Sequence, residues 1–251
     1  MASTINASTN STSGLVYNAD ASGVLQLQSN GVTGLTVGTG GVVTAANGIV
    51  MNTMTLGTAI TGEFEYDGGE LYFTPLGTQR GLVPSMQYYR LNSIVTGSNT
   101  IGSQSVLGVG VTLSSNTVYA FKGLYLLTKT AGTTSHVFAT TFGGTASINN
   151  ISYRASAKHN TTSFGLSSPS DSFVSYATAN TILGLVTASS ATTFTATEIE
   201  GTISVNAGGT FIPQYNLSAA PGGAYTTAAG SYFLIYPVGA AGSNTSVGTW
   251  A

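Results

Sequence analysis

The chain has 251 residues, enough for one large β domain or for a smaller domain with an extended arm. Charged residues make up only 6% of it, against about 25% in ordinary soluble domains. Six basic residues and a net charge of −2 provide no clustered basic face, which argues against a nucleic-acid partner.

The chain contains no cysteine, which excludes disulfides, thiolate chemistry and cysteine-based zinc sites. No apolar run approaches the roughly 18 residues needed to cross a bilayer. The first ten residues have neither a basic nor an apolar region of the kind found in export signals. We therefore expect neither membrane insertion nor a signal-directed export route.

Residues 1–14 are almost all Ser, Thr, Asn and Ala, a composition that buries too little apolar area to offset the entropy of ordering. We expect residues 1–22 to form an extended N-terminal arm that becomes ordered on a partner. Its few apolar side chains are the candidate anchoring contacts: Ile5, Leu15, Val16 and Tyr17.

Residues 23–60 contain short apolar pieces separated by Asn-Gly and Gly-Gly turn signals. Each piece has too few apolar side chains for a core of its own, but three chains wound together could share theirs along a common axis. We interpret the segment as a short β-rich fibrous neck. A simple hairpin flap is the alternative that the pattern leaves open.

Residues 61–95 are expected to form a connecting segment. Within it, Glu63, Glu65, Asp67 and Glu70 are spaced as in a calcium loop, but Thr74 occupies the position of the bidentate glutamate. Phe64 and Tyr66 alternate with the acids, which favours a strand with one solvated, charged face.

Residues 96–251 show no helical periodicity and a series of strand patterns at regular spacing. The pattern predicts an all-β chain whose C-terminal head is a jelly-roll-like β-sandwich. The expected strands are 106–113, 118–127, 136–142, 148–155, 173–176, 182–187, 198–206, 210–217 and 231–238.

The C-terminal run 198–238 is the strongest strand signal. Residues 198–206 and 210–217 alternate around Ala207-Gly208-Gly209 and predict a hairpin, in which Pro213 indicates an edge or an outward-facing amide position. Strands 118–127 and 231–238 are apolar on both faces, so we expect a second copy of the chain to cover one of them. The candidate trimer-interface residues are Tyr119, Phe121, Tyr125, Phe233 and Ile235.

Three stretches resemble a group of bacteriophage virion proteins described as tail fibres or minor structural proteins. They are Ser13-Gly14-Leu15 with residues 21–28, Phe73-Thr74-Pro75 with Arg80-Gly81, and the end of the chain, residues 231–239 and 246–250. The resemblance implies a trimeric β fibre with an N-terminal virion anchor and a C-terminal globular head.

Catalytic signals are weak. His136 and His159 lack a neighbouring acid or nucleophile in a recognisable order, although Asp171 and a serine could join them in space. Glu198 and Glu200 share one strand face at a spacing that an inverting glycosidase could use, but solvated strands have the same pattern. We expect no catalytic residues, no cofactor and no metal.

The predicted function is that of a structural tail-fibre component in the virion, assembled in the host cytoplasm as a homotrimer bound to other virion proteins. A capsid- or neck-attached fibre is the first alternative, and a glycan-hydrolysing tailspike the second. Host contact, with a glycan or a protein, is expected in the polar loops 157–170 and 218–230. Candidate contact residues are His159, Asn160 and Tyr225, with Tyr88 and Tyr89 as further exposed aromatics.

Overall fold

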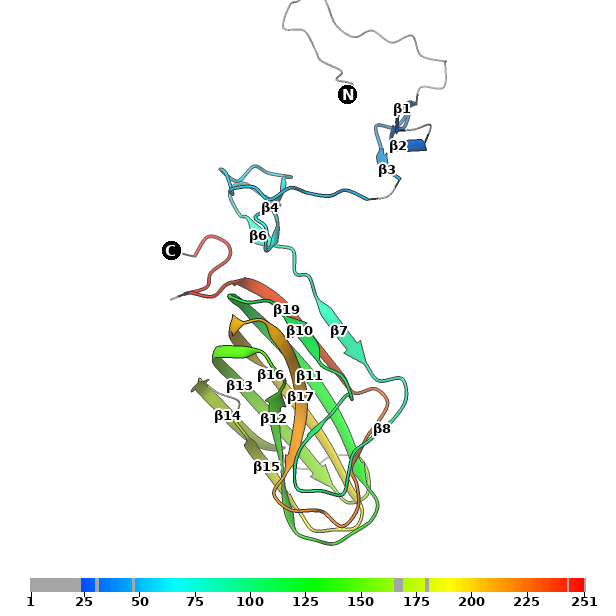
Figure 1. Ribbon diagram of the computed structural model, residues 1–251, viewed down its shortest axis with the longest axis vertical. Coiled ribbons are helices and arrows are strands. Elements are labelled where there is room, and N and C mark those ends of the chain that lie inside the picture. Colours follow the sequence, from blue (N-terminus) through cyan, green and yellow to red (C-terminus); the bar gives the residue numbers. More distant parts are fainter. Residues whose placement is uncertain are drawn as a thin grey trace, which may run out of the picture. The chain divides into compact units, whose positions relative to one another are not determined.

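The structure, a computed structural model, describes residues 24–29, 32–46, 48–164, 169–178, 181–242 and 244–250. All regular secondary structure in this part of the chain is β, which confirms the predicted all-β class (Figure 1). The chain divides into two units, Met1–Asn52 and Thr53–Ala251. The expected arm and its anchoring residues Ile5, Leu15, Val16 and Tyr17 lie outside the described residues.

The first unit contains a three-stranded antiparallel meander of β1 (Leu25–Ser29), β2 (Val32–Val37) and β3 (Val43–Ala45). It lies in the expected neck, but the neck's last residues, from Thr53 on, belong to the second unit. Most large apolar side chains of the meander and of the segment after it are exposed: Leu25, Leu27, Val32, Val42, Val43, Ile49 and Val50. A single copy of the chain therefore gives these side chains little cover.

A small antiparallel sheet begins the second unit, formed by β4 (Phe64–Tyr66), β5 (Leu71–Phe73) and β6 (Gly81–Leu82). The expected solvated acidic face is wrong for this strand. Phe64 is 54% exposed, whereas the neighbouring Glu65 points inward and is only 1% exposed. The carboxylate tolerates burial because Arg80 lies against it at 2.6 Å.

A β-sandwich of two sheets makes up the rest of the second unit. The larger sheet contains β14 (Pro169–Ala177), β13 (Ser147–Asn160), β16 (Thr193–Ala207), β11 (Thr117–Lys129), β19 (Tyr232–Ala240), β7 (Gln87–Arg90), β18 (Thr226–Thr227) and β8 (Val95–Thr96). The smaller sheet contains β10 (Val111–Leu113), β17 (Gly209–Leu217), β12 (His136–Gly143), β15 (Leu183–Ala188) and β9 (Gly102–Ser105). Because β7 and β8 belong to the larger sheet, the sandwich begins at Gln87 and not at residue 96.

Strands β16 and β17 do not form the predicted hairpin. β16 pairs with β11 and β13, whereas β17 pairs with β12, β10 and β9, so the chain crosses between sheets at Ala207-Gly208-Gly209. A Cβ on Gly208 would lie 2.8 Å from the Leu113 carbonyl oxygen, so this crossing point requires glycine.

Strand β17 is also not an edge strand, although it contains Pro213. The Pro213 carbonyl accepts a bond from the Val106 amide at 3.0 Å, on the side of β17 where β9 has ended and β10 has not begun. The amide position of Pro213 faces the same gap. Its missing N–H therefore interrupts no strand ladder.

The core between the sheets is rich in aromatic rings. Phe142 lies at its centre, with ring centroids 4.4 Å from Phe211, 5.1 Å from Tyr153 and 5.2 Å from Phe121. Phe233 joins this cluster from β19. Close packing of offset and edge-to-face rings holds the two sheets together.

The five residues predicted at the trimer interface belong to this core. Tyr119, Phe121, Tyr125, Phe233 and Ile235 are each at most 4% exposed in one copy of the chain. Their burial corrects the prediction, because side chains that the chain's own smaller sheet covers to this extent leave almost no surface for another subunit. The other faces of β11 and β19 are the partly exposed ones, with Leu124, Leu126, Tyr232, Leu234 and Tyr236.

Candidate functional site

A groove of about 320 Å³ opens at one lateral edge of the sandwich, between β7 of the larger sheet and β10 of the smaller sheet. Tyr88 and Tyr89 of β7 line it and are 54% and 46% exposed, as the sequence predicted. Val109, just before β10, is 42% exposed. Buried Phe233 and Ile235 also line the groove. We call this surface the open edge.

The open edge exists because its two strands each lack a neighbour. Among the described strands, β7 pairs only with β19, and β10 only with β17. On the opposite side of the sandwich, the Ser172 hydroxyl of β14 donates to the Gly184 carbonyl of β15 at 2.9 Å and ties the two sheets together. Unpaired strand edges with apolar side chains are surfaces that proteins normally cover.

The groove is chemically suited to binding. Its described lining consists of tyrosine, aliphatic, proline and phenylalanine side chains with Gln87 and Thr112 as the polar members. The described lining of the groove includes no Asp, Glu, His, Lys or Arg. Tyrosine combines a flat apolar ring with a hydroxyl, which suits protein interfaces and sugar recognition alike.

Sequence reasoning missed Val109 as part of this surface, because residues 106–113 were expected to be one continuous strand. Only Val111–Leu113 is regular strand. The two glycines on either side of Val109, at positions 108 and 110, are the signal that could have indicated the break.

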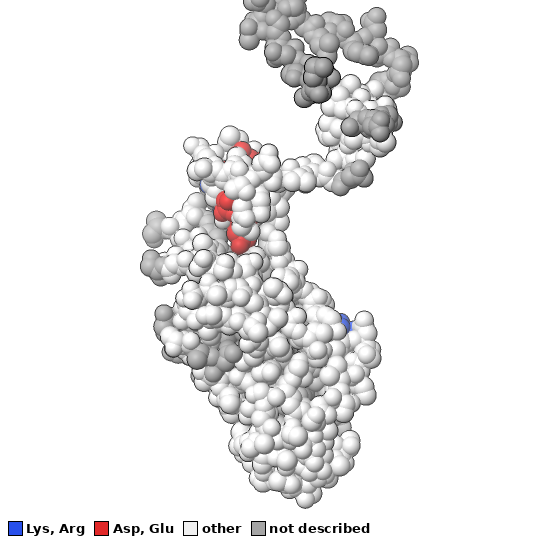
Figure 2. Space-filling model, in the orientation of Figure 1, with Lys and Arg blue, Asp and Glu red and all other residues white. Residues whose placement is uncertain are grey.

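Charge is distributed unevenly over the sandwich, and Figure 2 shows a face of it that is almost free of charged groups. Every exposed charged residue of the sandwich lies on a strand of the larger sheet: Arg90, Lys122, Arg154, Lys158, Asp171, Glu198 and Glu200. The strands of the smaller sheet contain no Asp, Glu, Lys or Arg. One outer face of the sandwich is thus charged and the other is neutral.

The two same-face glutamates lie on the charged outer face. Glu200 pairs with Arg154 at 2.8 Å, and both side chains are about half exposed. The hollow that Glu198 and Glu200 line measures about 50 Å³, far below the roughly 300 Å³ at which ligand pockets begin. The arrangement matches the solvated-strand interpretation and provides no cleft for a sugar ring.

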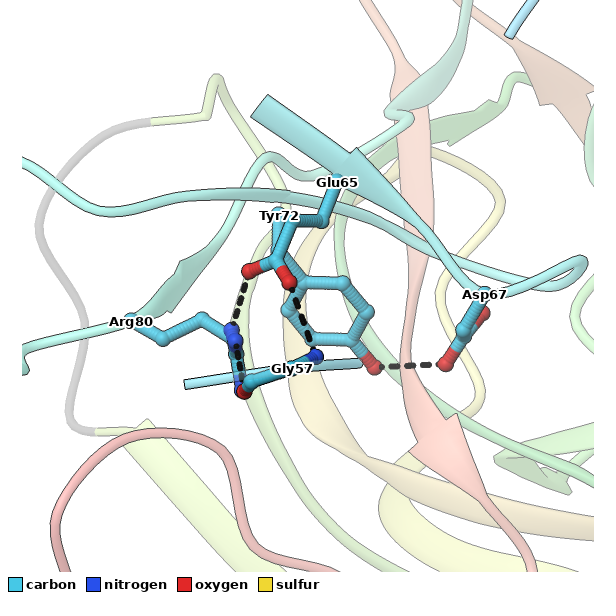
Figure 3. A network of polar contacts seen from close by, with 5 residues as sticks. All are labelled: Gly57, Glu65, Asp67, Tyr72 and Arg80. Atoms are coloured by element: carbon cyan, nitrogen blue, oxygen red, sulfur yellow. Dashed lines mark hydrogen bonds and ion pairs between the residues drawn. The ribbon is translucent and has the colours of Figure 1, made fainter. Parts of the chain in front are cut away.

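The acidic stretch in the small sheet forms a polar network instead of a metal loop (Figure 3). Arg80 Nε donates to Glu65 at 2.6 Å, and its Nη2 donates to the Gly57 carbonyl at 2.7 Å. The Gly57 amide in turn donates to Glu65 at 3.2 Å. The network ties the segment before β4 to the segment after β5, so its role is structural.

Asp67 organises the turn between β4 and β5. Its carboxylate accepts bonds from the amides of Gly69 and Glu70 and from the Tyr72 hydroxyl. Burial opposes ionisation of Asp67, but these hydrogen bonds outweigh it and lower the pKa of this carboxyl. Burial and the bond to Asp67 raise the pKa of Tyr72 to about 12.

The two loops predicted to contact a host lie at the same end of the sandwich. Strand β11 runs toward this end and β12 leaves it, β13 ends and β14 begins there, and the β15–β16 and β17–β18 connections lie there too. The chain enters β7 from the opposite end. These four connections, residues 130–135, 161–168, 189–192 and 218–225, contain no charged residue. We call this surface the loop end.

Backbone contact holds two of these loops together. Gly132 has a φ of +80°, and a Cβ there would lie 2.3 Å from the backbone of Gly222. The Gly222 amide also donates to the Asn99 side chain at 2.9 Å. Glycine at position 132 thus allows the β11–β12 loop to pack directly on the 218–225 loop.

Two of the three predicted host-contact residues remain accessible. His159 and Asn160 are half-buried at the end of β13, where Asn160 accepts bonds from the Thr162 amide and hydroxyl. Phe164 in the same loop is 37% exposed and packs edge-on against Phe194. Their role in host contact stays a prediction.

Tyr225, the third predicted contact residue, is fully buried, which corrects that prediction. Its hydroxyl lies 2.9 Å from His136 Nε2, and His136 Nδ1 lies 2.8 Å from the Thr134 carbonyl oxygen. Because a carbonyl can only accept, Nδ1 carries the hydrogen and Nε2 accepts from Tyr225. Burial raises the pKa of Tyr225.

We expect His136 to make the sandwich acid-sensitive. Burial, with a contribution from the positive charge of Lys129, lowers the pKa of His136 below its ordinary 6.5. At pH values between the lowered pKa and 6.5, the unfolded chain binds more protons than the folded chain. The contribution of neutral His136 to the free energy of unfolding is therefore full above pH 6.5 and falls as the pH drops through this window. The expected loss is about 1.4 kcal/mol for each pH unit between the two pKa values.

Thermal unfolding between about pH 7.5 and pH 5 measures this effect. The His136→Gln variant should show a flatter dependence of Tm on pH than the native chain. His159→Gln is the comparison. Burial also lowers the pKa of His159, but this side chain is half-buried with one long contact of 3.4 Å to Thr195, whereas His136 is 2% exposed, so we expect a smaller change of slope. An unchanged slope in His136→Gln would assign the acid sensitivity to other groups.

Lys129 is the one charged residue of the sandwich that is buried in the described structure, at 1% exposure. Its ammonium donates to carbonyl oxygens of Ala131, Gly132 and Ser190 at 3.0, 2.7 and 2.8 Å, with Ala191 at 3.4 Å. Burial lowers the pKa of Lys129. The side chain links the β11–β12 and β15–β16 loops and so helps to shape the loop end.

Comparison with known proteins finds no family model and no curated protein that matches this chain. The resemblance to virion fibre proteins therefore stays a prediction from the residues that carry it.

Two further findings concern the described residues alone. No group of three or more His, Asp or Glu side chains gathers there in a way that could hold a metal ion. A helix long and apolar enough to cross a bilayer is likewise absent from this part of the chain.

Proposed function

We propose that this chain is a structural virion protein of a bacteriophage, a homotrimeric tail-fibre component. In this proposal the N-terminal arm docks on other virion proteins, the segment around β1–β3 forms a short neck, and the sandwich is a jelly-roll-like head. The strand orders β14-β13-β16-β11 and β10-β17-β12-β15, in which most neighbours are distant in sequence, support the jelly-roll connectivity.

The exposed apolar side chains of the neck carry the proposal. Val32, Ile49 and Val50 are 63%, 78% and 93% exposed in a single copy. Leaving such side chains in water costs about 25 cal/mol for each Å² of apolar surface, and three copies winding together remove much of that surface. A chain with 6% charged residues has little else to keep such a surface soluble.

The loop end supports a role in host contact. Its four loops contain no charged residue, two of them are held together by backbone contacts at Gly132 and Gly222, and it lies opposite the end at which the chain enters the sandwich. Recognition of a host glycan or protein by such a surface relies on shape, stacking and neutral hydrogen bonds. Three copies on one axis raise the apparent affinity of weak single sites.

We expect the purified chain to sediment as a particle of three times its 25.4 kDa mass. Immunogold labelling of particles from the phage that encodes the chain should mark the tail. A stable monomer would remove the trimeric fibre from consideration. Gold on the capsid or neck would favour the alternative of a head-attached fibre, and unlabelled particles would contradict a virion role altogether.

A further inference from the structure

We propose that the open edge of one copy packs against the neutral outer face of the smaller sheet in the next copy, and that three such contacts close the trimer. The inference rests on the proposed homotrimer and names its two contact surfaces. We call the second surface the neutral face; it is the outer side of β10, β17, β12 and β15 with β9.

The outward side of the neutral face consists of uncharged side chains. Residue alternation places Ala139 and Thr141 of β12 on this side, opposite Asn216 and Gln214 of β17, but Ala139 and Thr141 are only 2% and 4% exposed. The accessible part of the face is therefore formed by the half-buried Gln214 and Asn216 and by the exposed Val137. Gly143 leaves room for the Gln214 carboxamide, since a Cβ there would lie 2.6 Å from its oxygen. A surface of small and amide side chains permits close approach of another protein over a wide area.

The absence of charge lowers the free-energy cost of covering this face. Interface cores are depleted of charged residues because the contacts made there rarely offset the cost of removing those charges from water. The strands of the smaller sheet contain no charged residue, whereas the outer face of the larger sheet contains Lys122, Arg154, Glu198 and Glu200. In an assembly the neutral face is therefore the side to bury and the charged face the side to leave in water.

The open edge supplies the complementary surface. Its exposed side chains are Tyr88 and Tyr89 of β7 and Val109 of the segment before β10. Tyr88 also packs against Tyr232 of β19, with ring centroids 5.6 Å apart. Tyrosine is enriched in interface cores because it buries a large apolar ring and keeps a hydroxyl for hydrogen bonding. Cover by another copy would also protect the unpaired edges of β7 and β10.

Geometry selects an edge-to-face contact over a face-to-face one. A cyclic trimer requires two different surfaces on each copy, inclined to each other so that the rotation closes. The open edge and the neutral face adjoin along β10, which belongs to both. Two opposite faces of the sandwich would instead stack copies into an open array.

The absence of cysteine from the chain allows a direct test by site-specific cross-linking. Val109→Cys places a thiol on the open edge, and Val137→Cys or Gln214→Cys places one on the neutral face. Val137 is 37% exposed and lies beside Gly184 on the outward side. Thr202→Cys is the matched control, on an exposed site of the outer face of the larger sheet.

The full-length variants are treated with a short bismaleimide and separated by denaturing electrophoresis. Double variants with Val109→Cys and either neutral-face cysteine should give a ladder that ends at a covalent trimer. Co-expressed single variants should cross-link to each other, and neither should cross-link to itself. The Val109→Cys, Thr202→Cys double variant should stay uncross-linked.

Cross-linking of Val109→Cys to itself, or to Thr202→Cys in preference to the neutral face, would overturn the edge-to-face arrangement. Sedimentation of the same samples separates this failure from a failure of the proposed function. A trimer with the wrong cross-links contradicts only the choice of surfaces. A monomer contradicts the homotrimer itself.

Discussion

Replacing Phe142 by alanine is expected to lower the free energy of unfolding of the sandwich by about 3–5 kcal/mol, the range for removal of a large aromatic side chain from a core. Phe142 is 3% exposed and stacks on Phe211 at 4.4 Å, with Tyr153 and Phe121 at its edges. The cavity would open where the two sheets meet, so neither sheet can close it alone. Urea denaturation followed by the fluorescence of the tyrosines measures the change.

Phe164→Ala is the control for this substitution. The same ring is removed, but Phe164 is 37% exposed and its one described ring contact is with Phe194. We expect a loss below about 1 kcal/mol, typical of substitutions outside the core. Equal losses in the two variants would contradict the position of Phe142 at the centre of the sandwich core.

Replacing Arg80 by alanine should unfold the small sheet selectively. The substitution leaves Glu65 buried without its ion pair, which costs about 3–5 kcal/mol for a buried pair broken on one side. It also removes the bond from Arg80 to the Gly57 carbonyl. Hydrogen exchange read by mass spectrometry should show lost protection in the segment around β4, β5 and β6, while the sandwich strands keep theirs.

Arg154→Ala provides the matched comparison, because it breaks the second ion pair of the described structure. That pair is half exposed on both sides, and such pairs contribute about 0–1 kcal/mol. The double variant Glu65→Gln, Arg80→Ala should recover part of the loss, since it removes the uncompensated charge. Normal protection of β4–β6 in Arg80→Ala would show that the sheet does not depend on the Glu65 pair.

Periodicity predicted the strands of the sandwich well because alternation directly reflects burial. The runs 118–127, 136–142 and 210–217 lie within β11, β12 and β17. Alternation says nothing about which strand lies beside which, however. The pairing of β16 with β11 and β13 depends on contacts distant in sequence, and a two-glycine turn between alternating runs fits a sheet crossing as well as a hairpin.

The same limit explains the misplaced site residues. Strands β11 and β19 are apolar on both faces, so the pattern alone could not distinguish the face that meets the smaller sheet from the face that stays accessible. Tyr225 follows a Pro-Gly-Gly turn and has the sequence context of an exposed loop residue, yet it is buried against side chains distant in sequence, among them His136, 89 positions away. The burial of Glu65 could not be predicted without knowing that Arg80, on another segment of the small sheet, forms an ion pair with it.

Lys129, at the end of β11, holds the loop end together in the way that a bound metal ion does in other proteins. Rings of backbone carbonyl oxygens commonly hold a metal cation, whose occupancy depends on its concentration. Here the cation is the ammonium of Lys129, fixed to the chain by its own side chain and surrounded by carbonyls of both loops. A tethered cation cannot be diluted away, chelated or exchanged. The carbonyl oxygens that Lys129 joins are therefore held by a cation whose presence does not depend on the ions in the surrounding medium.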